Sequence, residues 1–189
     1  MYQLKTEADF DSAHFLSGYT GKCSNIHGHR WHVEIEIESR KLEKNGQERG
    51  MLVDFGDLKK DLRELADSMD HTLIYEENTL RPKTLEALDE EGFHLVKVPF
   101  RPTAENFSEY FFRKMEEKGY PVKRAVVYET PNNCAAYRET EEETEAVWYQ
   151  LFDGNKQVLF RPESRMAPLY QMALIHRLTT EYQLFLMVC

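Results

Sequence analysis

Apolar and polar residues alternate most clearly between Arg30 and Ser39, and this pattern predicts a β-strand with one buried face. Residues 2–14 show a weaker extended pattern, and the polar, glycine-containing segment 17–26 predicts a long loop between the two strands. We therefore expect an antiparallel hairpin. The apolar positions of its second strand are Trp31, Val33, Ile35 and Ile37, and the polar positions are His32, Glu34, Glu36 and Glu38.

Two later segments have the spacing of amphipathic helices. The first follows Asp54 and the second begins near Thr103, and both residue types favour the N-cap position. Gly119 and Pro121 are expected to end the second helix. The apolar stripes are Leu58, Leu62, Leu65 and Met69 in the first helix, and Phe107, Tyr110, Phe111 and Met115 in the second.

Two more strands are predicted at 122–130 and 134–138, on either side of a turn. The resulting order predicts an α+β domain, with a four-stranded antiparallel sheet covered on one face by two helices. We expect this domain to span residues 1–139. Residues 140–189 begin with an acidic run and are expected to form a C-terminal extension of unknown role, such as a solvated linker and a packed or partner-bound segment.

The charge balance narrows the choice of partners. With 24 basic and 33 acidic side chains, the net charge of −9 argues against nucleic acid, although a local cationic cluster can still bind a small phosphorylated substrate. Cys23, Cys134 and Cys189 are far apart and odd in number, which is typical of a reduced protein. Without a signal segment or an apolar run of about 18–20 residues, we expect a cytoplasmic protein with no membrane association.

Three histidines are the strongest candidates for chemistry. His27 and His29 are two positions apart where the loop enters the second strand, so their side chains project from one face. Such a pair alone is a weak signal, because alternating strands produce it by chance. His14 ends the partner strand, however, and the hairpin would bring it beside the other two. Three neutral imidazoles with an open fourth position are typical of catalytic zinc.

Cys23 and the pair Asp70-His71 could add proton chemistry to a zinc site. Cys23 could be a fourth ligand, or a nearby thiolate whose pKa the cation lowers, and the residue types leave both alternatives open. Asp70 and His71 combine a carboxylate with an imidazole, the components of a proton relay. A histidine at a helix C-terminus is also favoured by the helix dipole alone.

Two further carboxylates, Glu105 and Glu129, are expected to be buried. Glu105 lies where a carboxylate can complete a helix N-terminus, which is a structural role. Glu129 follows the apolar residues of the third strand, where an unpaired carboxylate is costly and needs a partner. The N–H donors of a ligand would provide one.

Taken together, these motifs resemble the 6-pyruvoyltetrahydropterin synthase family over residues 1–139. The short gap between Cys23 and His27, and the phrase Tyr128-Glu-Thr-Pro-Asn-Asn-Cys-Ala, are similar to the 6-carboxy-5,6,7,8-tetrahydropterin synthases of queuosine and deazapurine biosynthesis. The motifs that carry the resemblance are Ala13-His14, Cys23-x3-His27-Gly28-His29, Asp70-His71, Pro102-Thr103-x-Glu105-Asn106 and Glu129-Thr130 with Tyr137.

The resemblance implies the tunnelling fold (T-fold), in which sheets of several subunits join into a barrel with active sites between subunits, and hence a homo-oligomer. It also implies residue roles. His14, His27 and His29 would bind zinc, Cys23 would accept a proton, and Asp70 with His71 would form the companion relay. Glu129 would anchor the pterin, with Thr103 and Glu105 near the same pocket.

The implied reaction converts 7,8-dihydroneopterin triphosphate to 6-carboxy-5,6,7,8-tetrahydropterin, with loss of triphosphate and acetaldehyde. Formation of 6-pyruvoyltetrahydropterin and cleavage of dihydroneopterin are alternatives for the same fold. A noncatalytic zinc- or pterin-binding module is a more distant one. Residues 140–189 depart from the family, whose members usually end soon after the strand that contains Tyr137.

Overall fold

The computed structural model describes residues 1–139, 149–153 and 156–160. The chain divides into two units, Met1–Glu139 and Thr140–Cys189. The first unit contains strands β1 (Tyr2–His14), β2 (His27–Ser39), β3 (Thr72–Glu76), β4 (Leu95–Val98), β5 (Val122–Thr130) and β6 (Asn133–Tyr137). Its helices are α1 (Phe55–Asp67), α2 (Pro82–Glu90) and α3 (Ala104–Glu117), with a short 3-10 turn at Lys22–Ser24.

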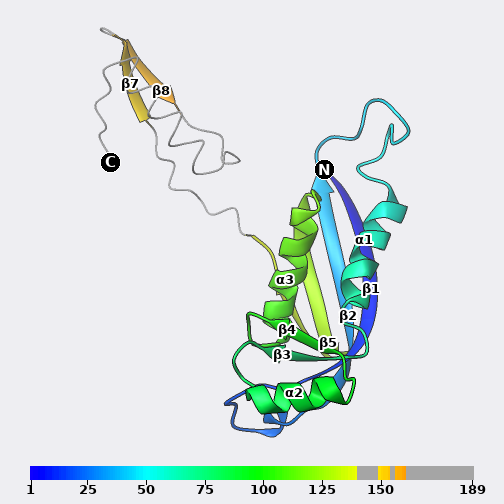
Figure 1. The fold of residues 1–189 in the computed structure, drawn as a ribbon. Helices are drawn as coiled ribbons and strands as arrows, with labels where there is room; N and C mark the ends of the chain where they lie inside the picture. Colours follow the sequence, from blue (N-terminus) through cyan, green and yellow to red (C-terminus); the bar gives the residue numbers. More distant parts are fainter. Residues whose placement is uncertain (140–148, 154–155, 161–189) are drawn as a thin grey trace. The chain divides into compact units, whose positions relative to one another are not determined.

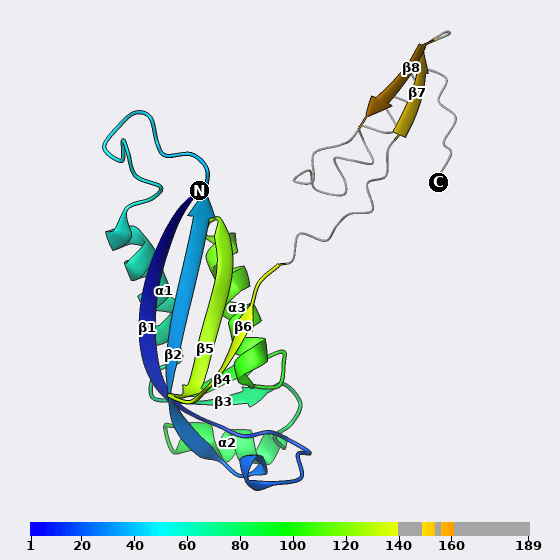
Figure 2. The same ribbon diagram turned by 180° about the vertical axis from the view of Figure 1, so that it is seen from behind.

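The six strands form one sheet in the order β4-β3-β1-β2-β5-β6 (Figures 1 and 2). At its centre, β1 and β2 form the predicted antiparallel hairpin, in a register that places Phe10 opposite Trp31 and His14 opposite His27. The alternation of apolar and polar residues in β2 places the two kinds of side chain on opposite faces of the sheet, as predicted. All four of its apolar side chains, Trp31, Val33, Ile35 and Ile37, are fully buried, and the polar ones face the other way.

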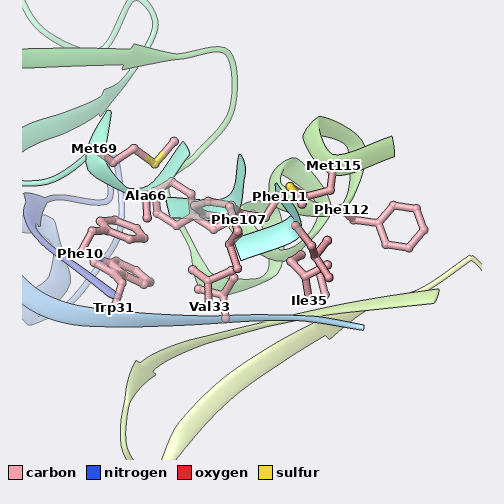
Figure 3. Close-up of a cluster of buried hydrophobic side chains, with 14 of the residues drawn as sticks. Phe10, Trp31, Val33, Ile35, Ala66, Met69, Phe107, Phe111, Phe112 and Met115 are labelled. Atoms are coloured by element: carbon pink, nitrogen blue, oxygen red, sulfur yellow. The ribbon is translucent and has the colours of Figure 1, made fainter. Parts of the chain in front are cut away.

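Helices α1 and α3 cover the same face of the sheet, in front of it in Figure 1 and behind it in Figure 2. Both begin at the predicted caps, because Asp54 accepts a hydrogen bond from the Gly56 N–H and Thr103 from the Asn106 N–H. Figure 3 shows the core between sheet and helices, where Phe10 stacks on Trp31 with ring centroids 6.0 Å apart. The edge-to-face contact of Phe107 with Trp31 is closer, at 4.9 Å.

The α+β class is confirmed, but the predicted sheet of four antiparallel strands and two helices was incomplete. β3 runs parallel to β1 and β4 runs parallel to β3, so the sheet is mixed, and α2 is a third helix in the connection between these two strands. The sequence pattern did not reveal β3, β4 and α2 because each of them is short or weakly buried. β3 and β4 have only 5 and 4 residues, and α2 has no fully buried side chain, with only Leu85 and Leu88 partly buried on its inner face.

In the second unit, the described residues form an antiparallel pair of β7 (Tyr149–Asp153) and β8 (Lys156–Phe160). The rest of the expected extension at 140–189 lies outside the described residues, and its role stays a prediction. Within the described part of the chain, no helix combines the length and the apolar character needed to cross a membrane.

Candidate metal and active site

The β1–β2 hairpin brings the three predicted histidines together. His14 ends β1 directly opposite His27, which begins β2, and His29 lies two residues further along the same strand. Their ring centroids are 4.4 Å apart for His14 and His27, 5.2 Å for His14 and His29, and 5.0 Å for His27 and His29. The cluster continues the buried face of the sheet beyond Trp31, whose ring lies against His14 and His29.

Backbone carbonyls fix the orientation of two imidazoles. Nδ1 of His14 lies 2.7 Å from the Pro102 oxygen, and Nδ1 of His27 lies 2.8 Å from the Asn25 oxygen. A carbonyl only accepts hydrogen bonds, so each Nδ1 carries the hydrogen and each Nε2 presents a lone pair. In the described residues, the Nε2 atoms of His14, His27 and His29 are all buried without a hydrogen-bond partner.

Burial also holds these imidazoles in the form that binds metals. It lowers the pKa of His14 to about 4, against the opposing effect of the hydrogen bond to Pro102. The pKa of His29 is lowered as well, mainly by burial. Both rings are therefore neutral near neutral pH, with lone pairs free for a cation.

Glu129 on β5 completes the cluster. Its Oε1 lies 3.2 Å from Nε2 of His29 and 3.5 Å from Nε2 of His14, and one ligand atom from each of the four residues lies within 4.8 Å of all the others. The sequence indicated that this carboxylate needs a partner, but not that it would face the histidines. Three imidazoles and a carboxylate, with buried lone pairs that lack partners, fit a divalent transition metal such as zinc.

A pocket of about 270 Å³ opens beside this cluster. Five residues singled out in the sequence line it, namely His14, Cys23, Thr103, Glu105 and Glu129. The expectation that Glu105 is buried was wrong, because the first turn of α3 emerges at the surface and leaves this side chain exposed. Glu129 is only partly buried, with 31% of its side chain exposed. The sequence reasoning did not assign six other residues to the pocket: Leu16, Tyr19, Ala104, Asn133, Cys134 and Ala135.

Cys23 lies in the 3-10 turn of the loop between β1 and β2, half-buried and with a free thiol. It lines the pocket, but it is not part of the His14, His27, His29 and Glu129 cluster. This arrangement favours a thiol beside a metal over a thiol bound to it.

Asp70 and His71 form a pair but do not line the pocket. The Asp70 carboxylate lies 2.7 Å from Nδ1 of His71, and its other oxygen accepts the N–H of Asp11 at 2.7 Å. The hydrogen bond from the Asp11 N–H, followed in size by the one with His71, holds the pKa of Asp70 below its usual range. His71 has a left-handed backbone, with φ of 53°, and 81% of its side chain is exposed. The pair predicted to act as a relay therefore lies at the surface of the first unit, away from the pocket.

A second group, Glu7, His32 and Glu34, lies on the opposite, polar face of the hairpin. The ammonium group of Lys5 already lies 2.6 Å from Glu34 and 3.9 Å from Glu7. A cation of the protein thus compensates these carboxylates. Among the described residues, no lysine or arginine forms an ion pair with the cluster around His14, which makes this cluster the better candidate for a metal.

The fold and the pocket define an α+β domain with a histidine-rich cluster that could hold a metal ion at the end of its central hairpin. Residues 3–140 match the family described as 6-pyruvoyl tetrahydropterin synthase, and the chain belongs to this family. The predictions of the family and of an enzyme are confirmed.

Named relatives agree with this assignment. The chain is 34% identical over 142 residues to the 6-carboxy-5,6,7,8-tetrahydropterin synthase of Haemophilus influenzae, covering 74% of this chain and 100% of the relative. It is 33% identical over 140 residues to the enzyme of the same name from Rickettsia bellii, covering 70% and 96%.

Solved structures share the fold of the first unit. An uncharacterized protein from Wolinella succinogenes matches with a TM-score of 0.61 and 21% identity, covering 74% of this chain and 98% of that one. The 6-pyruvoyl tetrahydropterin synthase of Caenorhabditis elegans matches with a TM-score of 0.52 and 21% identity, covering 74% and 96%. The predicted T-fold class is confirmed.

Proposed function

We propose that the chain converts 7,8-dihydroneopterin triphosphate to 6-carboxy-5,6,7,8-tetrahydropterin in a zinc-dependent reaction that releases triphosphate and acetaldehyde. The observation that carries this proposal is the grouping of three unpartnered histidine Nε2 atoms beside a pocket that His14, Cys23 and Glu129 line. The names of the relatives from Haemophilus influenzae and Rickettsia bellii support the choice of product.

His14, His27 and His29 would hold the zinc through Nε2, with His14 and His27 kept in the required tautomer by Pro102 and Asn25. When bound, the metal supplies Lewis acidity, which makes the C–H and O–H bonds of a coordinated substrate side chain more acidic. Replacing His29 with alanine should abolish stoichiometric zinc, measured by atomic emission after dialysis. Full retention of zinc in that variant would contradict the assignment.

Cys23 would act as the base that removes a proton from the substrate side chain. Its place on the pocket wall, outside the group of potential ligand atoms, supports this role over that of a zinc ligand. We expect Cys23→Ala to keep its zinc and lose turnover. Loss of the metal from that variant would make Cys23 a ligand and overturn the division of labour.

Glu129 would anchor the pterin, with its carboxylate accepting charge-assisted hydrogen bonds from the amidine-like edge of the ring. Thr103 and Glu105, on the same pocket, would complete the binding surface for the substrate. The position of Glu129 near His29 offers a second possibility, a metal ligand. Glu129→Gln should keep zinc and raise KM if the carboxylate binds the pterin, whereas loss of zinc would assign it to the metal.

Asp70 and His71 would handle the second proton in the pocket of another copy of this chain, in a homo-oligomer. The exposure of His71 and its absence from the pocket of its own subunit support this arrangement. Mixing the inactive variants Cys23→Ala and His71→Ala, after dissociation and reassembly, should restore activity because some pockets receive both intact residues. Mixtures as inactive as their components would argue against a shared site.

Product analysis separates the remaining alternatives. Incubation with 7,8-dihydroneopterin triphosphate should release acetaldehyde, detected by coupling to alcohol dehydrogenase. A pyruvoyl product would indicate a 6-pyruvoyltetrahydropterin synthase. Turnover of dephosphorylated dihydroneopterin alone would indicate the cleaving homologue, and stoichiometric zinc without any turnover would indicate a noncatalytic module.

A further inference from the structure

The segment that carries Cys23 has little to hold it in place. None of residues 16–26 is fully buried, and most are exposed. Its backbone hydrogen bonds are internal, from Leu16 to Cys23 at 2.8 Å, from Ser24 to Gly21 at 3.2 Å and from Asn25 to Lys22 at 3.1 Å. These bonds shape the loop, but they do not fix it against the wall of the pocket.

Arg101 provides that attachment from a segment far away in the sequence. Its Nη2 donates to the carbonyl oxygen of Ser17 at 2.5 Å, and its guanidinium carbon lies 5.9 Å from the centre of the Tyr19 ring. Within the described residues, this is the one hydrogen bond that joins residues 16–26 to a segment outside the β1–β2 hairpin.

The backbone of Arg101 and its neighbour also connects this side chain to the histidine cluster. Its carbonyl oxygen accepts hydrogen bonds from the N–H of Thr103 at 2.8 Å and from the side-chain amide of Asn106 at 2.8 Å. The next residue, Pro102, orients His14 through its own carbonyl. One short segment before α3 thus sets both the ring of His14 and the position of the Cys23 loop.

We propose that Arg101 is a positioning residue, which holds the Cys23 loop at the distance from the histidine cluster that turnover requires. This inference rests on the proposed role of Cys23. The guanidinium suits the task because it donates to the Ser17 carbonyl while lying over the Tyr19 ring, a combination that the point charge of lysine reproduces only in part.

Stability alone is a poor explanation for this side chain. Its Nε–H is buried without a hydrogen-bond partner among the described residues, which is unfavourable. Removing the guanidinium would take away one good hydrogen bond together with this unsatisfied donor, so the two effects on stability oppose each other. Loss of turnover should therefore exceed loss of stability.

The test compares Arg101→Met and Arg101→Lys with the control Arg63→Met, which changes an exposed arginine on α1. Full-length, zinc-loaded proteins are assayed for kcat and KM with dihydroneopterin triphosphate, for zinc content, and for iodoacetamide labelling of each cysteine by peptide mass spectrometry. We expect Arg101→Met to keep its zinc and melting temperature while kcat falls by about 10- to 100-fold, the scale of misplaced catalytic groups. Cys23 should be labelled several-fold faster, with Cys134 unchanged, and lysine should restore part of both properties.

Unchanged kcat and unchanged Cys23 labelling in Arg101→Met would overturn the proposal. So would loss of zinc, or an equal change in labelling of Cys23 and Cys134, because each would indicate a general structural role. If the wild-type protein fails to turn over the triphosphate, the proposed function fails. The ratio of Cys23 to Cys134 labelling still decides in that case whether Arg101 holds the loop.

Discussion

Phe107 links the hydrophobic core to the histidine cluster, and its replacement by alanine should damage both. The side chain is fully buried and packs edge-to-face against Trp31, Phe10 and Phe100, with ring centroids 4.9, 6.3 and 5.8 Å away. Truncating a buried phenylalanine costs about 3–5 kcal/mol, and three lost aromatic contacts favour the upper half of that range. We therefore expect a loss of about 4 kcal/mol in the free energy of unfolding.

The cavity that Phe107→Ala leaves should also loosen the histidine cluster. Trp31 separates Phe107 from the histidines, with its ring 5.0 Å from His14 and 5.5 Å from His29. A tilt of the indole into the cavity would free both imidazoles to rotate. Since groups that orient metal ligands contribute about 10- to 100-fold to affinity, we expect zinc to bind at least about tenfold more weakly.

Urea denaturation of chelator-treated protein measures the loss of unfolding free energy without the stabilising contribution of a metal. Competition with a zinc-sensitive dye measures the loss of zinc affinity. Phe93→Ala is the matched control, because Phe93 is 60% exposed and its loss should change stability by no more than about 0.5 kcal/mol. A cost below about 1 kcal/mol for Phe107→Ala, or zinc affinity equal to that of the control, would refute the reasoning.

Three further predictions concern the frame around the site. Asp61 accepts hydrogen bonds from Lys118 at 2.8 Å and Tyr120 at 2.6 Å, and the Lys118 bond is the main cause that lowers its pKa below 3.8. Its stabilising effect is therefore complete above that value and is lost as the pH falls through the folded pKa. Asp61→Asn should cost about 1 kcal/mol at neutral pH and progressively less in acid, and a pH-independent difference in urea midpoints would contradict this. Gly119 follows α3 with φ of 93°, and a Cβ added there would meet no atom within 4 Å, so Gly119→Ala should cost about 1–2 kcal/mol from backbone strain alone. An unchanged melting temperature in that variant would contradict this. Removing zinc with a chelator should lower the unfolding free energy by about 2.7 kcal/mol relative to protein held at 100 times the zinc Kd, and identical melting curves would argue against a metal in the native state.

The sequence was most informative where one face of an element is buried. The alternation around Trp31 and the stripe that contains Phe107 predicted β2 and α3, because periodicity follows directly from burial on one side. The grouping of His14 with His27 could also be predicted, since a hairpin determines which residues oppose each other. Elements without such a pattern were missed. The helix at Pro82–Glu90 has no fully buried side chain, and its inner face consists of only two partly buried leucines, Leu85 and Leu88, which is too short a pattern to predict a helix.

Contacts between distant segments were beyond the reach of local patterns. Glu129 approaches His29 only because β5 pairs with β2, and neither residue type reveals that pairing. The orientation of His14 depends on the carbonyl of Pro102, a backbone group that every residue possesses. The exposure of a side chain at a helix start depends on how the helix lies in the fold. The residue types alone therefore did not reveal that Glu105 is exposed.

The position of Trp31 gives this protein an intrinsic optical probe. Its indole is fully buried and lies against two of the three imidazoles that would bind zinc, so its fluorescence should respond to protonation or metal binding at those rings. The chain has one other tryptophan, Trp148, and Trp148→Phe would leave the emission of Trp31 alone. Metal loading, acid titration and the loosening caused by Phe107→Ala could then be followed in one cuvette, without substrate and without an added dye.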